Sequence, residues 1–150
     1  MNSTFRQVLR KFVLIFFNDI LVYSSDWDSH LLHLHEVFTR LRLHQLFAKL
    51  SKCEFGSVSL GYLGHIISGD GVAVDPDKIQ TIKEWPLPHS VKTLQGFLGL
   101  CGYYRRFVQH YSSIAAPLTN LLRKDAFAWT DSATEAFQRL QEALMNTPVL

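Results

Sequence analysis

The sequence predicts an α+β chain in which a short helix, two hairpins and a longer helix precede a mostly helical second part. Two observations predict this class: strand-like apolar runs occur before residue 75, and helical spacing of apolar residues dominates after it. The tract from Trp85 to Pro88, with two prolines, marks a boundary within the helical part. Hydrophobic residues make up 47% of the 150 residues and charged residues 19%, which is enough apolar surface for a core.

The first part is predicted to begin with a short helix and a hairpin. Asn2 and Ser3 are suitable caps for a helix that reaches about Arg10. β-branched and aromatic residues at 12–17 and 20–24 predict two strands. Asn18 and Asp19 between them predict the turn, because both residue types tolerate left-handed backbone angles.

A helix should follow the hairpin and pack on it. Ser25 or Asp26 caps this helix, which runs to about Leu46 and carries apolar residues at helical spacing, namely Leu31, Leu34, Phe38 and Leu41. From residue 47 to 74 the pattern becomes extended and rich in glycine. Strands at 62–67 and 72–74, joined by a turn at 68–71, form the second predicted hairpin.

Capping residues divide the second part into helices. Asp75 and Pro76 begin a helix that ends at Trp85, and Ser90 begins the longest one, to about Val108. A further helix covers about residues 114–122. Thr130 caps the last helix, to about residue 145, whose apolar face is Ala136, Phe137, Leu140 and Leu144.

The net charge of +2 is small, but the basic residues are unevenly placed. Two segments contain no acidic residue, residues 1–17 and 91–124, and their basic residues are Arg6, Arg10, Lys11, Lys92, Arg105, Arg106, Arg123 and Lys124. Such segments are either contacts for a polyanion or ordinary solvated faces. The apolar run at 12–17 is too short to cross a bilayer and no signal-peptide pattern is found, so we expect a soluble, intracellular chain that is not secreted.

Few residues in the sequence point to chemistry by themselves. Asp19, held in a tight turn beyond two strands, is a possible magnesium ligand, but bare turns of this kind are common. Neither cysteine has the spacing of a disulfide framework or a zinc site. The histidines near Cys53, which are His30, His33, His35 and His65, also lack zinc-finger pairing, and the first three are interpreted as a partly exposed helix face.

A series of short motifs runs along nearly the whole chain. The first is the aromatic-x-Asp-Asp hairpin, seen here as Phe16-Phe17-Asn18-Asp19. The others follow in order over nearly the whole chain: Lys52-Cys53-Glu54-Phe55, Tyr62-Leu63-Gly64-His65, Trp85-Pro86-x-Pro88, Gly96-Phe97-Leu98-Gly99-Leu100, Gly102-Tyr103-Tyr104-Arg105-Arg106-Phe107 and Pro117-Leu118. In this order the motifs resemble those of the reverse transcriptases of gypsy-type long-terminal-repeat (LTR) retrotransposons. The resemblance implies an RNA-directed DNA polymerase that uses two Mg2+ ions.

The resemblance also implies that this chain lacks most of the ion site. In the family one aspartate ligand lies on an earlier strand, upstream of the residues present here, and the other is the first Asp of the hairpin, matched by Asn18. Asp19 matches the second Asp and is a vestigial catalytic and metal-site residue. Because an asparagine offers one neutral carbonyl oxygen in place of a carboxylate, the resemblance implies that Mg2+ is not bound stably and that the chain alone does not polymerise DNA.

The remaining family sites contact a template–primer duplex, either RNA–DNA or DNA. Residues 62–68 resemble the primer grip, whose candidate residues are Tyr62, Leu63, Gly64 and His65. The alternative is a plain buried hairpin. Residues 90–108 resemble the thumb helix, whose candidates are Gly96, Gly99, Gly102, Tyr103, Arg105 and Arg106. The glycines recur every three residues and permit close approach, either of another helix or of a nucleic-acid backbone.

The implied organisation is an incomplete palm at 1–74, a helical thumb at 75–124 and the start of a connection or ribonuclease H-like region at 125–150. Two hypotheses for function follow. The first is a truncated reverse transcriptase fragment without activity of its own, and the second is a nucleic-acid-binding module that uses the thumb helix and the basic segments. A third interpretation is that the chain is an internal piece of a Pol polyprotein, which would then supply its partner segments.

Overall fold

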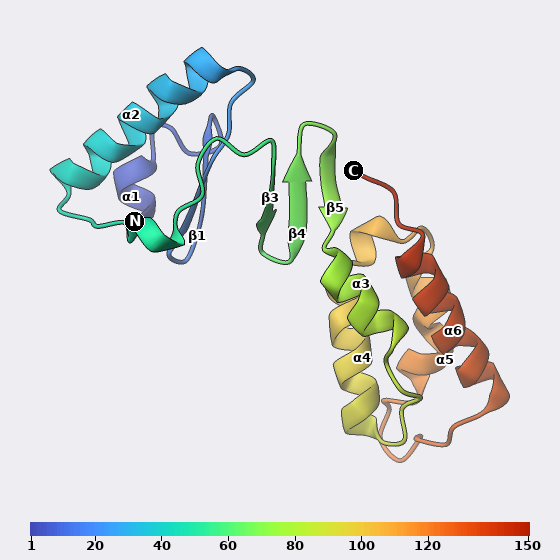
Figure 1. Cartoon of the computed structure of the whole chain (residues 1–150). Helices are drawn as coiled ribbons and strands as arrows, with labels where there is room; N and C mark the ends of the chain where they lie inside the picture. The colour runs from blue at the N-terminus through green and yellow to red at the C-terminus, as the bar shows by residue number, and fades with distance from the viewer. The chain divides into compact units, whose positions relative to one another are not determined.

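The computed structural model describes residues 1–150, and these form two compact units, Met1–Val58 and Ser59–Leu150. Figure 1 shows the first in blue to cyan and the second in green to red. The predicted palm, thumb and connection divide the chain at other positions, and this subdivision stays a prediction. None of the helices combines the length and hydrophobicity needed to cross a bilayer.

The first unit packs two helices on one hairpin. Its elements are α1 (Asn2–Phe5), β1 (Val13–Phe16), β2 (Asp19–Val22) and α2 (Trp27–Leu43), followed by a 3-10 turn (Leu50–Lys52). A two-stranded sheet is barely stable alone in water, so it needs this cover. The covering core is small and consists of Phe5, Val8, Val13, Val37 and Leu41. Arg40 also joins α2 to α1, because its guanidinium donates to the Thr4 carbonyl at 3.1 Å.

The hairpin and the packing of α2 on it are confirmed, but three details differ from prediction. The first helix ends at Phe5, and Arg10, with φ +65°, could not belong to it. Phe16 pairs with Asp19, so the turn is Phe17-Asn18 and Asp19 already begins β2. The buried face of α2 carries Val37 and Leu41, whereas the predicted Leu31 and Phe38 are exposed.

The second unit begins with a three-stranded antiparallel sheet in the order β3 (Ser59–Tyr62), β4 (His65–Ser68), β5 (Gly71–Val74). The predicted single strand at 62–67 is wrong, because a turn at Leu63-Gly64 divides it and Tyr62 pairs with His65. The predicted turn before β5 is confirmed, with Ser68 paired to Gly71. At the C-terminus, Leu150 lies against β5 and exchanges two backbone hydrogen bonds with Val72, at 2.6 and 2.8 Å.

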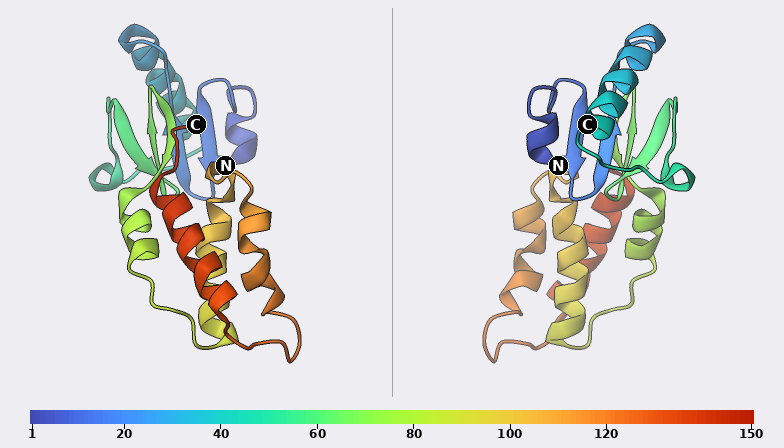
Figure 2. Two further views of the ribbon diagram at one scale, coloured as in Figure 1. Left: turned by 90° about the vertical axis from the view of Figure 1, so that its right-hand side faces the viewer. Right: turned by 90° about the vertical axis from the view of Figure 1, so that its left-hand side faces the viewer.

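Four helices follow the sheet: α3 (Pro76–Lys83), α4 (Val91–Tyr103), α5 (Tyr111–Asn120) and α6 (Asp131–Met145). Figure 2 shows them side by side, with the sheet at one end. The predicted N-caps are confirmed: Asp75, Ser90 and Thr130 each accept a backbone hydrogen bond from the first turn. α4 ends earlier than predicted, since a separate 3-10 turn (Arg105–Phe107) follows it. α5 begins earlier, after His110 in a left-handed conformation.

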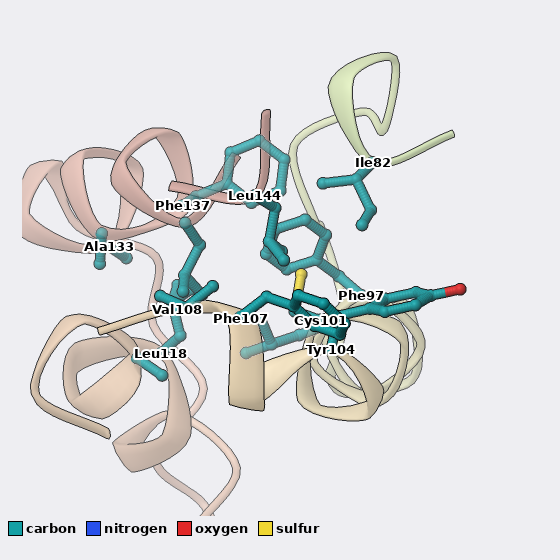
Figure 3. Close-up of a cluster of buried hydrophobic side chains, with 14 of the residues drawn as sticks. Ile82, Phe97, Cys101, Tyr104, Phe107, Val108, Leu118, Ala133, Phe137 and Leu144 are labelled. Carbon is teal, nitrogen blue, oxygen red and sulfur yellow. The ribbon is translucent and has the colours of Figure 1, made fainter. Parts of the chain in front are cut away.

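One apolar core holds the four helices together (Figure 3). Phe97 of α4 lies against Phe137 of α6, with ring centroids 4.5 Å apart. The predicted face of α6 is confirmed, because Ala136, Phe137, Leu140 and Leu144 are all buried. Gln141 donates to the carbonyl of Ile82 at 2.9 Å and so joins α6 to the end of α3. The buried side of α4 therefore faces α6, and its other side is left open.

Candidate nucleic-acid interface

Two predicted sites, the turn at Leu63-Gly64 and the end of α4, lie in contact within the second unit. The hydroxyl of Tyr103 donates to the Leu63 carbonyl at 2.6 Å, and the hydroxyl of Tyr104 donates to the Gly64 carbonyl at 2.6 Å. Each tyrosine lies 40 residues from its partner in the sequence. The fold thus brings the two segments that resemble the primer grip and the thumb helix into direct contact.

The turn itself has an unusual backbone. Leu63 and Gly64 both have positive φ, +53° and +76°, a combination suited to the tight turn of a two-residue hairpin. For Leu63 this left-handed conformation costs about 1–2 kcal/mol. At Gly64 an added Cβ would lie 2.7 Å from the hydroxyl oxygen of Tyr104, so a side chain here would collide with the tyrosine. Contacts from α4 must therefore support the turn.

His65 connects the turn to the same aromatic residues. Its ring lies 5.4 Å from that of Tyr103, 5.3 Å from that of Tyr104 and 5.7 Å from that of Phe107, measured between centroids. Its Nδ1 lies 3.0 Å from the Leu63 carbonyl oxygen, which accepts a hydrogen bond when that nitrogen carries the proton. Three groups therefore hold the backbone of the turn.

Tyr104 is the most enclosed residue of this site, with 1% of its surface exposed. In Figure 3 its ring belongs to the core cluster and its hydroxyl oxygen points away from the other labelled side chains. Burial, followed by the nearby Tyr103 and Asp75, raises the pKa of Tyr104 to about 12. The hydroxyl therefore keeps its proton, and remains a hydrogen-bond donor, throughout the neutral range.

The open side of α4 forms a continuous face, which we call the α4 face. It consists of exposed residues at helical spacing: Lys92, Gln95, Gly96, Gly99, Tyr103 and Arg106, the last from the 3-10 turn. A Cβ added at Gly99 would meet nothing within 4 Å. Glycine inside a helix costs about 1 kcal/mol relative to alanine. No neighbouring atom in this chain requires a glycine at position 99, so its packing does not explain why the less favourable residue is present.

The other two predicted glycines have different surroundings. A Cβ added at Gly96 would lie 3.4 Å from the ring of Trp85, and one at Gly102 would lie 3.6 Å from the hydroxyl of Tyr111. Gly102 is half-buried and lies at the edge of the α4 face. The three glycines thus do not form one uniform surface, and Gly99 is the one that stands fully open.

The cations of the α4 face, Lys92 and Arg106, and the neighbouring Arg105 are unpaired. Lys92, Arg105 and Arg106 are exposed, and no acidic residue occurs between residues 91 and 124. The chain has one ion pair, between Arg40 and Glu36 in the first unit, so none of these three cations is paired. Unpaired cations at both ends of one helix attract a polyanion such as nucleic acid.

The predicted metal site at the hairpin of the first unit has few groups that could bind an ion. Asn18 and Asp19 are both exposed at the tip of the hairpin, next to Phe17, whose φ is +51°. No group of three or more histidine, cysteine, aspartate or glutamate side chains is placed to hold a metal ion. One carboxylate and one amide oxygen do not make up the donor set that a hard divalent ion requires.

Sequence reasoning missed Tyr104 as a site residue. Its spacing from Phe97 and Cys101 marks it as part of the buried face of α4, which the structure confirms. A buried tyrosine usually finds a partner for its hydroxyl. That general rule was the available signal, but it does not identify the Gly64 carbonyl as the partner.

Comparison with known families and proteins agrees with the motif order. The family described as reverse transcriptase (RNA-dependent DNA polymerase) matches residues 1–67. An uncharacterized mitochondrial protein of Arabidopsis thaliana is 48% identical over 120 residues, which cover 79% of this chain and 76% of that protein. The retrovirus-related Pol polyprotein from transposon 297 of Drosophila melanogaster is 37% identical over 152 residues. That match covers 100% of this chain and 14% of the polyprotein.

Solved structures share the fold over 99% of this chain. The foamy viral protease-reverse transcriptase in complex with double-stranded DNA matches with a TM-score of 0.88 and 24% sequence identity. The same viral protein in complex with an RNA/DNA hybrid matches with a TM-score of 0.84 and 23% identity. The chain covers 26% and 20% of those chains.

Reverse transcriptases use divalent metal ions. The chain belongs to the reverse transcriptase family of gypsy-type LTR retrotransposons and corresponds to part of the reverse transcriptase region of their Pol polyproteins.

Proposed function

We propose that this part of a reverse transcriptase binds a nucleic-acid duplex, RNA–DNA or DNA, along the α4 face and the adjoining turn. The observation that carries the proposal is the open Gly99 on a helix face that has cations and no acidic residue. A duplex backbone can approach closely where side chains are missing, and its phosphates gain from nearby cations. The viral structures that share this fold hold double-stranded DNA or an RNA/DNA hybrid, which supports the same class of ligand here.

The predicted contacts divide into two kinds. Lys92, Arg105 and Arg106 are proposed to contact phosphates, whereas Gly99 leaves room for the sugar–phosphate backbone and Gly96, which lies against Trp85, adds no bulky side chain to the face. Tyr62, Leu63, Gly64 and His65 supply the turn next to the exposed ring of Tyr103. Contacts of this type do not read bases, so the proposed binding is independent of nucleotide sequence.

The second part of the proposal is that this chain alone does not polymerise DNA. Two-ion phosphoryl transfer requires carboxylates that fix both ions. Asp19 is the one carboxylate at the hairpin tip, and Asn18 beside it is neutral. Stable Mg2+ binding at this hairpin is therefore not expected.

The test of binding is the salt dependence of affinity, measured by fluorescence anisotropy with a short labelled RNA–DNA hybrid. Each phosphate contact contributes about 0.9 to the slope of log affinity against log salt. The double variant Lys92→Gln/Arg106→Gln should lower the slope by about 1.8. Arg42→Gln/Lys49→Gln is the matched control, because both cations are exposed in the first unit and lie outside the α4 face, and it should leave the slope unchanged. A weak wild-type affinity that does not change with salt would contradict the binding proposal.

The test of inactivity is primer extension on a primed template with magnesium. Neither the wild-type chain nor Asn18→Asp should extend the primer, because the substitution restores one ligand while the chain still lacks a third carboxylate near it. A magnesium-dependent product that disappears on Asp19→Ala would show that the chain is active.

A further inference from the structure

Consecutive tyrosines bind consecutive carbonyls where α4 meets the turn. Tyr103 donates to the Leu63 carbonyl and Tyr104 to the Gly64 carbonyl, each over 2.6 Å. The two residues differ sharply in exposure, which is 53% for Tyr103 and 1% for Tyr104. Tyr103 thus belongs to the α4 face, whereas Tyr104 connects the turn to the buried core.

We infer that Tyr104 is a positioning residue that fixes the Leu63-Gly64 turn to the helical core, so that the turn and the α4 face meet a duplex as one surface. The inference rests on the proposed function. Its structural part, the fixing of the turn, can be measured without any ligand.

The geometry of the turn explains why it needs fixing. Leu63 has φ +53°, a backbone conformation that is unfavourable for leucine. The Gly64 carbonyl accepts from Tyr104 and also from the Asp75 backbone N–H, at 3.3 Å. Because the latter bond is long, the tyrosine is the stronger of the two contacts. Its loss would leave the Gly64 carbonyl with the long Asp75 contact alone and would loosen the turn relative to the helical core.

The ring of Tyr104 makes this contact rigid. The ring packs in the apolar core with Phe107, at a centroid distance of 6.3 Å, and forms an edge contact with His65. Gly64 allows the hydroxyl its close approach, since a Cβ there would lie 2.7 Å from the hydroxyl oxygen. Both sides of the contact are therefore specific to the residues present.

The experiment removes one hydroxyl at a time from the full chain. Tyr104→Phe deletes the contact to Gly64 and keeps the ring. Tyr111→Phe is the matched control, because its hydroxyl is also partly buried in the second unit but makes no hydrogen bond to the turn. Each variant is measured for affinity toward the RNA–DNA hybrid and for hydrogen exchange of the Asp75 amide.

Tyr104→Phe should weaken hybrid binding by about threefold to tenfold, the equivalent of one net hydrogen bond. The salt slope should stay unchanged because no phosphate contact is removed. Exchange at Asp75 should become faster in Tyr104→Phe and stay as in the wild type in Tyr111→Phe. Gly64→Ala should disrupt the same contact, because the added Cβ would collide with the Tyr104 hydroxyl. The loss of binding in the double variant Gly64→Ala/Tyr104→Phe should therefore be smaller than the sum of the two single losses.

Three results would overturn the inference. They are unchanged binding by Tyr104→Phe, equal weakening by Tyr111→Phe, and unchanged exchange at Asp75 in Tyr104→Phe. If the wild-type chain does not bind the hybrid, the proposed function fails, and with it the role in binding. Faster exchange in Tyr104→Phe would then still show that this residue fixes the turn.

Discussion

Replacing Gly99 by alanine separates a binding role for the α4 face from a purely structural one. Gly99 lies inside α4, and an added Cβ would meet no atom within 4 Å. The substitution should therefore stabilise the second unit by about 1 kcal/mol, the usual helix preference of alanine over glycine. For a unit of this size that gain corresponds to a rise in melting temperature of about 4–8 °C.

The same substitution should weaken binding. If a duplex backbone lies against Gly99, the new methyl group must be accommodated in a close contact, and overpacking of this kind typically costs about 1–3 kcal/mol. Since about 1.4 kcal/mol corresponds to a tenfold change in affinity, we expect a loss of at least about fivefold. If the Gly99→Ala variant is more stable than the wild type and binds the duplex more weakly, the needs of folding do not explain the glycine at position 99.

The assays are thermal unfolding followed by circular dichroism and anisotropy with the labelled RNA–DNA hybrid. Gln138→Ala is the control, because Gln138 is exposed on α6 and the substitution also favours the helix. It should leave affinity unchanged. If Gly99→Ala raises stability and binds the hybrid as tightly as the wild type, close approach at the α4 face is refuted.

Two further predictions concern the core of the second unit. Because the pKa of Tyr104 is raised to about 12 by burial, its contribution to stability is present below the ordinary tyrosine pKa of about 10 and is lost as pH rises toward 12. Alkaline unfolding followed by circular dichroism should therefore be less steep in Tyr104→Phe, and equal steepness would argue against this assignment. Leu140→Ala should destabilise the second unit by about 2–5 kcal/mol, since Leu140 is 0% exposed in the core. Hydrogen exchange of the first unit should not change, and a parallel loss of protection there would show that the two units unfold together.

Four helix starts could be predicted because their causes are local, whereas α1 and α5 begin without a side-chain cap. Asp26, Asp75, Ser90 and Thr130 each bond a backbone N–H within three residues. The face of α2 was predicted less well. The apolar residues of α2 lie on several of its faces. Helical spacing alone therefore could not distinguish the buried Val37 from the exposed Phe38.

The turn at Leu63-Gly64 could not be predicted, because its cause is distant. A leucine with positive φ contradicts local preference, and the hydroxyl that supports it comes from Tyr103, 40 residues later. The same distance explains why motif order indicated both halves of the candidate site but not their contact. Sequence spacing grouped Gly96, Gly99 and Gly102 on one face and left both helix packing and nucleic-acid contact open; it could not distinguish the open Gly99 from Gly96 beside Trp85 and Gly102 beside Tyr111.

The pairing of Leu150 with Val72 has a practical consequence for labelling. An added Cβ at Gly71 would collide with the Leu150 carbonyl, so this glycine and the last residue fit each other closely. A fluorophore or nitroxide attached after Leu150 would therefore sit beside the β5 edge and report on the sheet, not on a loose tail. Affinity tags for the experiments above are better placed before Met1, where they leave this contact intact.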